Sequence, residues 1–297
     1  MTGALKSSSA TPTPDLLGVE FATGADGIPV ARIDDLVLAM VMSPSGFAFL
    51  ASAVFVRRPL AELTCADFIG HDGRLANEAE FRRRVAETAG HNRDLAKLNR
   101  VQTRISASTP WGGSQMAVIY AEGVIAHSTA GHGGFHLSAD RNSKVHSLLR
   151  KVTPWYEEDC EWAIVALSFP ELFTGYERAA AEKTIRNTWP DEWEAIHGAE
   201  LTEGESWVKD RRAFDRRHAA DHVVISAIFS DQHPGMTEVM AVVGGHGRAD
   251  KDERRFLIPS DEYAGRSRFG FVIDPNRHAE YHGPSSFIGW RGREDGS

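Results

Sequence analysis

Short apolar runs separated by turn residues dominate the first quarter of the chain. Residues 36–56, LVLAMVMSPSGFAFLASAVFV, carry no charged side chain, and Pro44 and Gly46 stand near the middle of this run. Its length would fit a membrane-spanning helix. Proline and glycine at its centre instead favour a turn between two strands, and Val and Phe suit a half-buried sheet. The pattern therefore predicts a β-hairpin and no contact with a membrane.

Helical signals follow this hairpin in two places. Asn77 is a suitable N-cap for a charged helix over residues 78–100, since two glutamates then lie at the positive end of the helix dipole. From Tyr156 onward, apolar residues recur at spacings of three and four, which predicts another helix with Cys160 on its core face. Further helices are expected between Pro170 and residue 220.

Runs rich in β-branched residues predict strands in two other regions. Residues 116–129 contain a second hairpin, and residues 222–274 contain four apolar runs separated by turn residues. The fold class predicted is α+β, with an N-terminal β-hairpin, a central mixture of hairpin and helices, and C-terminal antiparallel strands. The division expected is a disordered tail at 1–27, an N-terminal hairpin plus helical region at 28–108, a central α+β domain at 109–220, and a β-rich region at 221–297 that packs on the central domain.

Charge and cysteine content narrow the range of functions. The chain has 297 residues and a formal net charge of -8, which argues against bulk nucleic-acid binding, because a nonspecific binder needs a basic face. Two cysteines are too few for a disulfide framework and indicate a reducing compartment. The first fifteen residues lack the apolar core of a signal peptide. We therefore expect a cytoplasmic protein.

The densest group of chemically useful side chains lies in the central region. The segment STAGHGGFHLSADRN at 128–142 contains His132 between glycines, which leave its imidazole accessible, and His127 and His136 lie close by in sequence. The segment WYEEDCEW at 155–162 offers four carboxylates and one thiol as complementary ligands. Two histidines with a carboxylate or thiolate can hold zinc, keep a position open for water and lower the pKa of that water toward about 7.

These residues support one catalytic hypothesis and one structural alternative. No HExxH or CxxC motif is present, so no sequence motif requires a cofactor. Zinc remains possible as the metal that these residue types could bind. The alternative is a structural loop whose histidines bond backbone groups. The candidate residues are, for catalysis, His132, Glu157 and Asp159; for binding, Ser128, Gly131, Gly133, Gly134 and His136; and for metal, His127, His132, His136 and Cys160.

The two segments also carry a family resemblance. Residues 109–142 and the following run WYEEDCEWAIVALSFPELF resemble the central part of an uncharacterised family of bacterial, plasmid and phage proteins, known only as a domain of unknown function. The resemblance covers about residues 109–197. It implies a plasmid or prophage setting and brings no activity or catalytic residues with it.

Three functions remain open at this point. The leading hypothesis is a soluble accessory protein of a mobile element that acts by binding an unknown protein partner. The first alternative is a His/carboxylate or zinc-dependent hydrolase with its site at the AGHGG turn and the start of the YEEDCE segment. The second is an acidic antirestriction-like mimic of nucleic acid, although the acids are interleaved with bases. Specific DNA binding by an arginine face also stays open.

Overall fold

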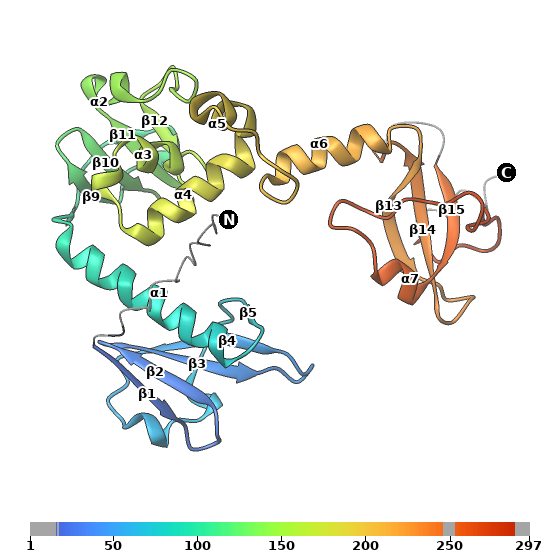
Figure 1. Cartoon of the computed structure of the whole chain (residues 1–297), viewed down its shortest axis with the longest axis horizontal. Coiled ribbons are helices and arrows are strands. Elements are labelled where there is room, and N and C mark those ends of the chain that lie inside the picture. The colour runs from blue at the N-terminus through green and yellow to red at the C-terminus, as the bar shows by residue number, and fades with distance from the viewer. Residues whose placement is uncertain (1–15, 17, 246–252, 289–297) are drawn as a thin grey trace, which may run out of the picture. The chain divides into compact units, whose positions relative to one another are not determined.

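The computed structural model describes residue 16 and residues 18–245 and 253–288 (Figure 1). Its helices and antiparallel sheets confirm the α+β prediction. The chain divides into two compact units, residues 1–185 and residues 186–297. Within the described parts, no helix is both long enough and apolar enough to cross a membrane. Most of the predicted tail, residues 1–15 and 17, lies outside the described residues.

The first sheet of the first unit contains the predicted N-terminal hairpin. Its strands follow the order β1-β2-β3-β4-β5, each antiparallel to the next. The bounds are β1 Val19–Thr23, β2 Pro29–Ile33, β3 Leu36–Met42, β4 Ala48–Val54 and β5 Arg74–Leu75. β3 and β4 pair over their whole length, with Gly46 at φ +82° in the turn between them. β1 consists of residues that were predicted to belong to the disordered tail, and this prediction is wrong for them. They pair in register with β2 and so extend the sheet by one strand.

Both faces of this sheet are covered. The helix α1, Glu78–Lys97, begins at the predicted N-cap Asn77 and packs Phe81, Val85 and Ala89 against one face (Figure 1). The 3-10 helices η1, Leu60–Glu62, and η2, Cys65–Asp67, belong to the segment that covers the other face. The apolar hairpin is therefore buried on both sides, which explains why it lacks charged residues.

The second sheet of this unit carries the candidate site. Its strand order is β12-β11-β10-β9-β6, and β9, β10 and β11 form consecutive hairpins. The strand bounds are β6 Val101–Thr103, β9 Met116–Ala121, β10 Val124–Ser128, β11 Gly133–Leu137 and β12 Trp155–Glu157, with the short pair β7 Ser108–Thr109 and β8 Gly112–Gly113 beside them. The helices of this part are α2 Ala139–Lys144, α3 Trp162–Ser168, η3 Pro170–Leu172 and α4 Gly175–Thr188.

One helix prediction is wrong in this region. Residues 155–157 form β12, and the helix begins only at Trp162. The reason is Tyr156, which is fully buried, pairs with Phe135 of β11 and donates a hydrogen bond to Asn142 Oδ1 at 2.6 Å. Cys160 consequently precedes the helix and is half-buried, so it does not lie on the core face.

A partly buried ion pair connects the segment after α1 to α4. Arg100 binds both carboxylate oxygens of Glu177 in α4, at 2.9 and 2.6 Å, and its guanidinium lies 4.0 Å from the ring centroid of Tyr120. Burial raises the pKa of Glu177, but the bonds from Arg100 and from the Thr174 amide lower it by more. The pair keeps α4 against the aromatic residues on one face of the sheet.

The second unit has its own core. It contains α5 Pro190–His197, α6 Trp207–Arg217, β13 His222–Phe229, β14 Met236–Val243, β15 Arg254–Pro259 and α7 Ser260–Ala264, with strand order β13-β14-β15. The fourth predicted strand, near residue 272, forms only an isolated bridge to Val223. Glu238 is fully buried and accepts from Arg255 at 3.0 Å, from Ser285 Oγ at 2.7 Å and from the Ser286 amide at 2.7 Å.

We expect Arg255→Met to lower the free energy of unfolding by about 3–5 kcal/mol, because it leaves the buried Glu238 carboxylate without its cation. Arg277→Ala is the control, since Arg277 forms an ion pair with Glu262 but is 63% exposed; its loss should cost less than about 1 kcal/mol. Urea unfolding followed by circular dichroism measures both. Equal effects of the two variants would contradict the role given to Glu238.

Candidate metal centre

Two consecutive glycines shape the sheet where the candidate site lies. A Cβ atom on Gly134 would come within 2.3 Å of both the Trp111 ring and the Tyr156 carbonyl oxygen. A Cβ atom on Gly133 would come within 2.4 Å of Glu158 Oε2 and 2.8 Å of the His127 carbonyl oxygen. The missing side chains therefore make room for an indole at one position and for a carboxylate at the other.

The turn from β10 to β11 presents His132. Thr129 closes this turn: its amide and its hydroxyl both donate to the His132 carbonyl oxygen, at 2.8 and 2.7 Å. The His132 amide in turn donates to Thr129 Oγ1 at 3.2 Å. The imidazole of His132 is exposed at a position that the backbone of a short, well-bonded turn holds in place.

The structure brings His132 together with two glutamates. One ligand atom each of His132, Glu157 and Glu158 lies within 4.8 Å of the other two. Glu157 is the last residue of β12 and pairs with Gly134, and the Glu158 amide donates to the Gly133 carbonyl oxygen at 3.1 Å. Pairing of β12 with β11 thus places two carboxylates beside the histidine turn. Among the described residues, this is the group with the spacing needed for a metal ion.

The carboxylate of Glu157 is only partly used by the protein. Its Oε2 accepts a hydrogen bond from the Asp159 amide at 2.7 Å, whereas its Oε1 is buried and has no hydrogen-bond partner within the described parts of the chain. The Glu157 amide donates to Glu161 Oε2 at 2.8 Å, and Lys151 forms an ion pair with the other oxygen of Glu161. A buried carboxylate oxygen without a donor favours a bound cation.

The other two candidate histidines make other contacts, although His127 lines one cavity together with Glu158. His127 is buried and its Nδ1 lies 3.0 Å from Ser114 Oγ, while His136 lies 4.5 Å from the Trp155 ring, measured between centroids. Burial lowers the pKa of both imidazoles, and the charge of His136 lowers that of His127 further. Neither belongs to the group around His132. Both pack against Trp155, whose ring contacts that of Trp111, and these contacts are consistent with a structural role for the two histidines.

The remaining predicted residues lie around the group without joining it. Asp159 supplies its amide to Glu157, and Cys160 is not part of the group. Ser128 is exposed at the end of β10, where its carbonyl oxygen accepts from the Gln115 amide. Gly131 lies in the turn with nothing within 4 Å of its Cβ position.

A small cavity borders the group on its Glu158 side. Its volume is about 270 Å³, slightly below the range of about 300–1,000 Å³ that is typical of pockets for drug-sized ligands. Aromatic side chains form much of its wall, with Ser128 and two carboxylates at its edge. The lining residues include Tyr120, Phe135, Trp162, Phe173, Ser128, Glu158 and Glu177.

Sequence patterns could not have found all of these residues. The acidic run at 155–162 contains both glutamates, but only the β12 register selects Glu157 and Glu158 from it. Trp111 and Thr129 act through contacts across the sheet and the turn, and nothing in their own sequence neighbourhood signals this. The glycines were the visible signal, although the sequence showed their flexibility and not the close contacts that require them.

One comparison with known proteins found a match, and it assigns no activity. Residues 104–219 match the family model of a domain of unknown function (DUF7007). This confirms the resemblance noted from the sequence, which lies inside the matched range. No curated protein and no solved structure matches the chain.

We expect Gly134→Ala to lower the free energy of unfolding by about 1–3 kcal/mol, because the added methyl group would overlap the Trp111 ring and the Tyr156 carbonyl. Gly131→Ala, three residues away in open space, should change it by less than about 0.5 kcal/mol. Urea unfolding of both variants measures the difference. A Gly134→Ala protein as stable as the wild type would contradict the close packing of β11 against Trp111 and Tyr156.

The two buried histidines predict the direction of a pH effect. The unfolded chain takes up protons near pH 6.5, whereas the lowered pKa values of His127 and His136 delay uptake in the folded chain. Stability should therefore fall as the pH drops from 7.5 to below 6.5, until the folded-state pKa values are passed. Urea midpoints at several pH values measure this. His127→Asn, whose amide can reach the Nδ1 position, should weaken the dependence, and His282→Asn, exposed on the second unit, should not.

Proposed function

We propose that His132, Glu157 and Glu158 bind one divalent transition-metal ion and that the protein is a metal-dependent hydrolase. The observation that carries this proposal is the group of three ligand atoms within 4.8 Å of one another. Ligands of a tetrahedral zinc ion lie about 3.4 Å apart, so small side-chain rotations would close the group around a metal. The unpartnered Glu157 Oε1 supports the same interpretation.

The ligand types suit catalysis better than a closed structural site. One imidazole and two carboxylates leave a fourth position of a tetrahedral metal for water, and a bound zinc ion lowers the pKa of that water to about 7. His132 is exposed, so substrate can reach this position from solvent. Structural zinc sites, in contrast, are dominated by four thiolate or imidazole ligands.

The neighbouring cavity indicates the class of substrate. Because Glu158 belongs both to the ligand group and to the cavity wall, a group held in the cavity would place its attached bond beside the metal. The rings of Tyr120, Phe135 and Phe173 favour a small apolar group. We infer an ester or amide with such a group next to the cleaved bond.

Protein binding remains the second candidate, and one surface favours it. Val54, Phe55 and Ile69 lie near the end of β4 in the first sheet, with exposed side-chain areas of 61%, 69% and 78% of their maxima. Phe55 also has φ +58°, an unfavourable conformation for a bulky side chain. Exposed apolar side chains of this size are typical of partner surfaces. The role as an accessory protein of a mobile element remains part of this second hypothesis.

Metal binding tests the proposed function directly. Elemental mass spectrometry of untagged protein, followed by calorimetric titration with Zn²⁺ and Mn²⁺, should show about one ion per chain. His132→Ala and Glu158→Gln should weaken binding by more than about 100-fold, since loss of an outer-sphere partner alone costs about 10- to 100-fold. Hydrolysis of a panel of chromogenic esters and amides should require the bound metal. Its rate should fall in the variants that bind metal weakly.

Glu122→Gln is the matched control. Glu122 is an exposed glutamate in the β9–β10 turn, at the other end of the same hairpin. It should bind metal like the wild type. An equal loss of affinity in Glu122→Gln, or no metal bound by wild-type protein, would contradict the site. Metal binding without any hydrolysis would contradict the enzyme proposal and would move protein binding to first place.

A further inference from the structure

The second unit contains two hollows that share a wall. The first, of about 520 Å³, is lined by residues of α6, of the loop before it and of the segment 267–269. The second, of about 400 Å³, lies between the end of α6 and the segment 262–278. Phe214, Arg217 and Ser267 line both. We call this continuous depression the α6 groove.

Several basic side chains of the α6 groove lack an acidic partner among the described residues. Arg216 and Arg217, in the last turn of α6, are exposed and form no ion pair or hydrogen bond within residues 18–245 and 253–288. Arg266 donates only to the Tyr263 carbonyl oxygen and lies over the Tyr263 ring. Of the four acids that line the groove, two are paired with a cation, Asp210 with Arg268 and Glu262 with Arg277, whereas Glu203 and Asp274 form no ion pair within the described residues.

The arginine run of α1 provides the contrast. Arg82 pairs with Glu78, and Arg83 pairs with Glu80 and Glu87 on the same helix. Arg84 donates to the Asp72 carbonyl oxygen. An anion at α1 would have to displace these partners, whereas Arg216 and Arg217 are available at once. The α6 groove therefore presents unpaired arginines although the chain has a net charge of -8.

Aromatic rings lie beside these arginines. Phe269 contacts Phe214 and Trp207, with ring centroids 5.7 and 5.8 Å apart, and all three rings are at least partly exposed. The guanidinium of Arg268 lies 4.7 Å from the Phe269 centroid. Partly exposed rings interleaved with arginines are the arrangement with which proteins stack bases while holding phosphates.

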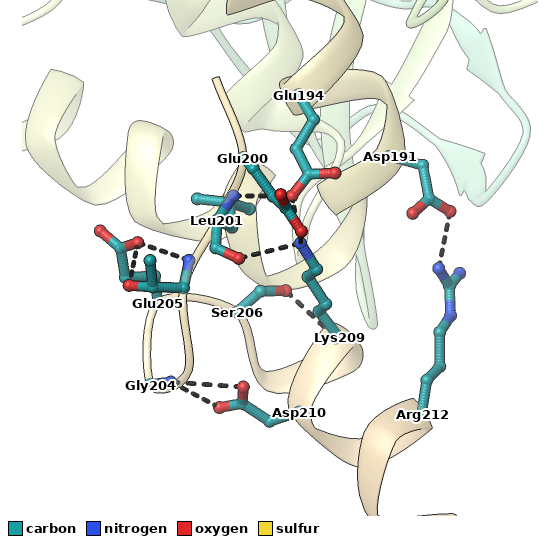
Figure 2. A network of polar contacts seen from close by, with 11 residues as sticks. Asp191, Glu194, Glu200, Leu201, Gly204, Glu205, Ser206, Lys209, Asp210 and Arg212 are labelled. Carbon is teal, nitrogen blue, oxygen red and sulfur yellow. Dashed lines mark hydrogen bonds and ion pairs between the residues drawn. The ribbon is translucent and has the colours of Figure 1, made fainter. Parts of the chain in front are cut away.

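One wall of the groove is held rigid by a network of polar contacts (Figure 2). Lys209 of α6 points toward the loop before it, and its ammonium binds Glu194 Oε1 at 2.6 Å and the Leu201 carbonyl at 2.9 Å. Asp210 accepts from the Gly204 amide at 3.0 Å, and Arg212 binds Asp191. These charges are used within the protein. The network holds α6 in place, so that Arg216 and Arg217 are presented without reorganisation.

We propose that the α6 groove binds single-stranded nucleic acid, with Arg216, Arg217 and Arg266 contacting phosphates and Phe269 stacking on a base. Each hollow falls within the size range of ligand pockets, and together they provide room for adjacent nucleotides. The inference is independent of the metal centre, which lies in the first unit.

Fluorescence anisotropy of the full chain with a short fluorescein-labelled oligothymidylate tests the proposal. Arg216→Ala/Arg217→Ala should weaken binding at least about ten-fold and reduce the slope of log affinity against log salt by about 1.4, since each phosphate contact on a single strand contributes about 0.7. Phe269→Leu should weaken binding about five-fold or more with an unchanged slope, because it removes stacking and keeps every charge.

Arg212→Ala is the matched control, because Arg212 is an exposed arginine of the same helix that does not line the groove. It should bind within about two-fold of the wild type. Urea midpoints of all variants establish that each is folded. The proposal is overturned by absence of binding at low salt, by an equal loss in Arg212→Ala, or by an unchanged affinity in Phe269→Leu. Tighter binding of inorganic polyphosphate, duplex DNA or a phosphopeptide than of oligothymidylate would also overturn it.

Discussion

The candidate metal centre depends on the absence of two side chains. Gly133 and Gly134 stand at the start of β11, where a Cβ atom on either would overlap a neighbour. Without them, Trp111 could not lie against the sheet, β12 could not approach as closely at Tyr156, and Glu158 could not lie beside the histidine turn. The pairing of β12 with β11, which brings the carboxylates to His132, follows from this close packing. The arrangement of the candidate ligands thus depends first on close packing around the two glycines.

Patterns along the sequence predicted the turns and helix starts that a few adjacent residues determine. Pro44 and Gly46 located the first hairpin, and Asn77 located the start of α1, because turn and cap preferences are properties of a few adjacent residues. The stretch after Trp155 was predicted as helix because its apolar spacing fits one. Tertiary pairing of Tyr156 with Phe135 prevailed there. The same long-range pairing decides which acids meet His132, so the sequence could identify the segment and not the ligand set.

Charge is distributed unevenly between paired and unpaired positions. Arg82 and Arg83 of α1 are bound to acids one turn away, and Arg100 binds both carboxylate oxygens of Glu177. At the end of α6 the pattern changes, since the acids of that region bind Lys209, Arg212 and Arg268. The net charge alone therefore does not describe which surfaces of this protein carry unpaired charge. What a surface can attract depends on which charges the fold has already neutralised.

The ion pair of Glu238 and Arg255 also has a consequence for how the last sheet assembles. β14 aligns Glu238 with Leu257 and Met240 with Arg255, so the two charges lie diagonally across neighbouring strands. A slip of one residue would turn Arg255 to the opposite face and leave the buried Glu238 without its cation. Misaligned strands would therefore carry an uncompensated charge, while the native alignment carries none. In this sheet the charged pair therefore favours the native strand register over registers shifted by one residue.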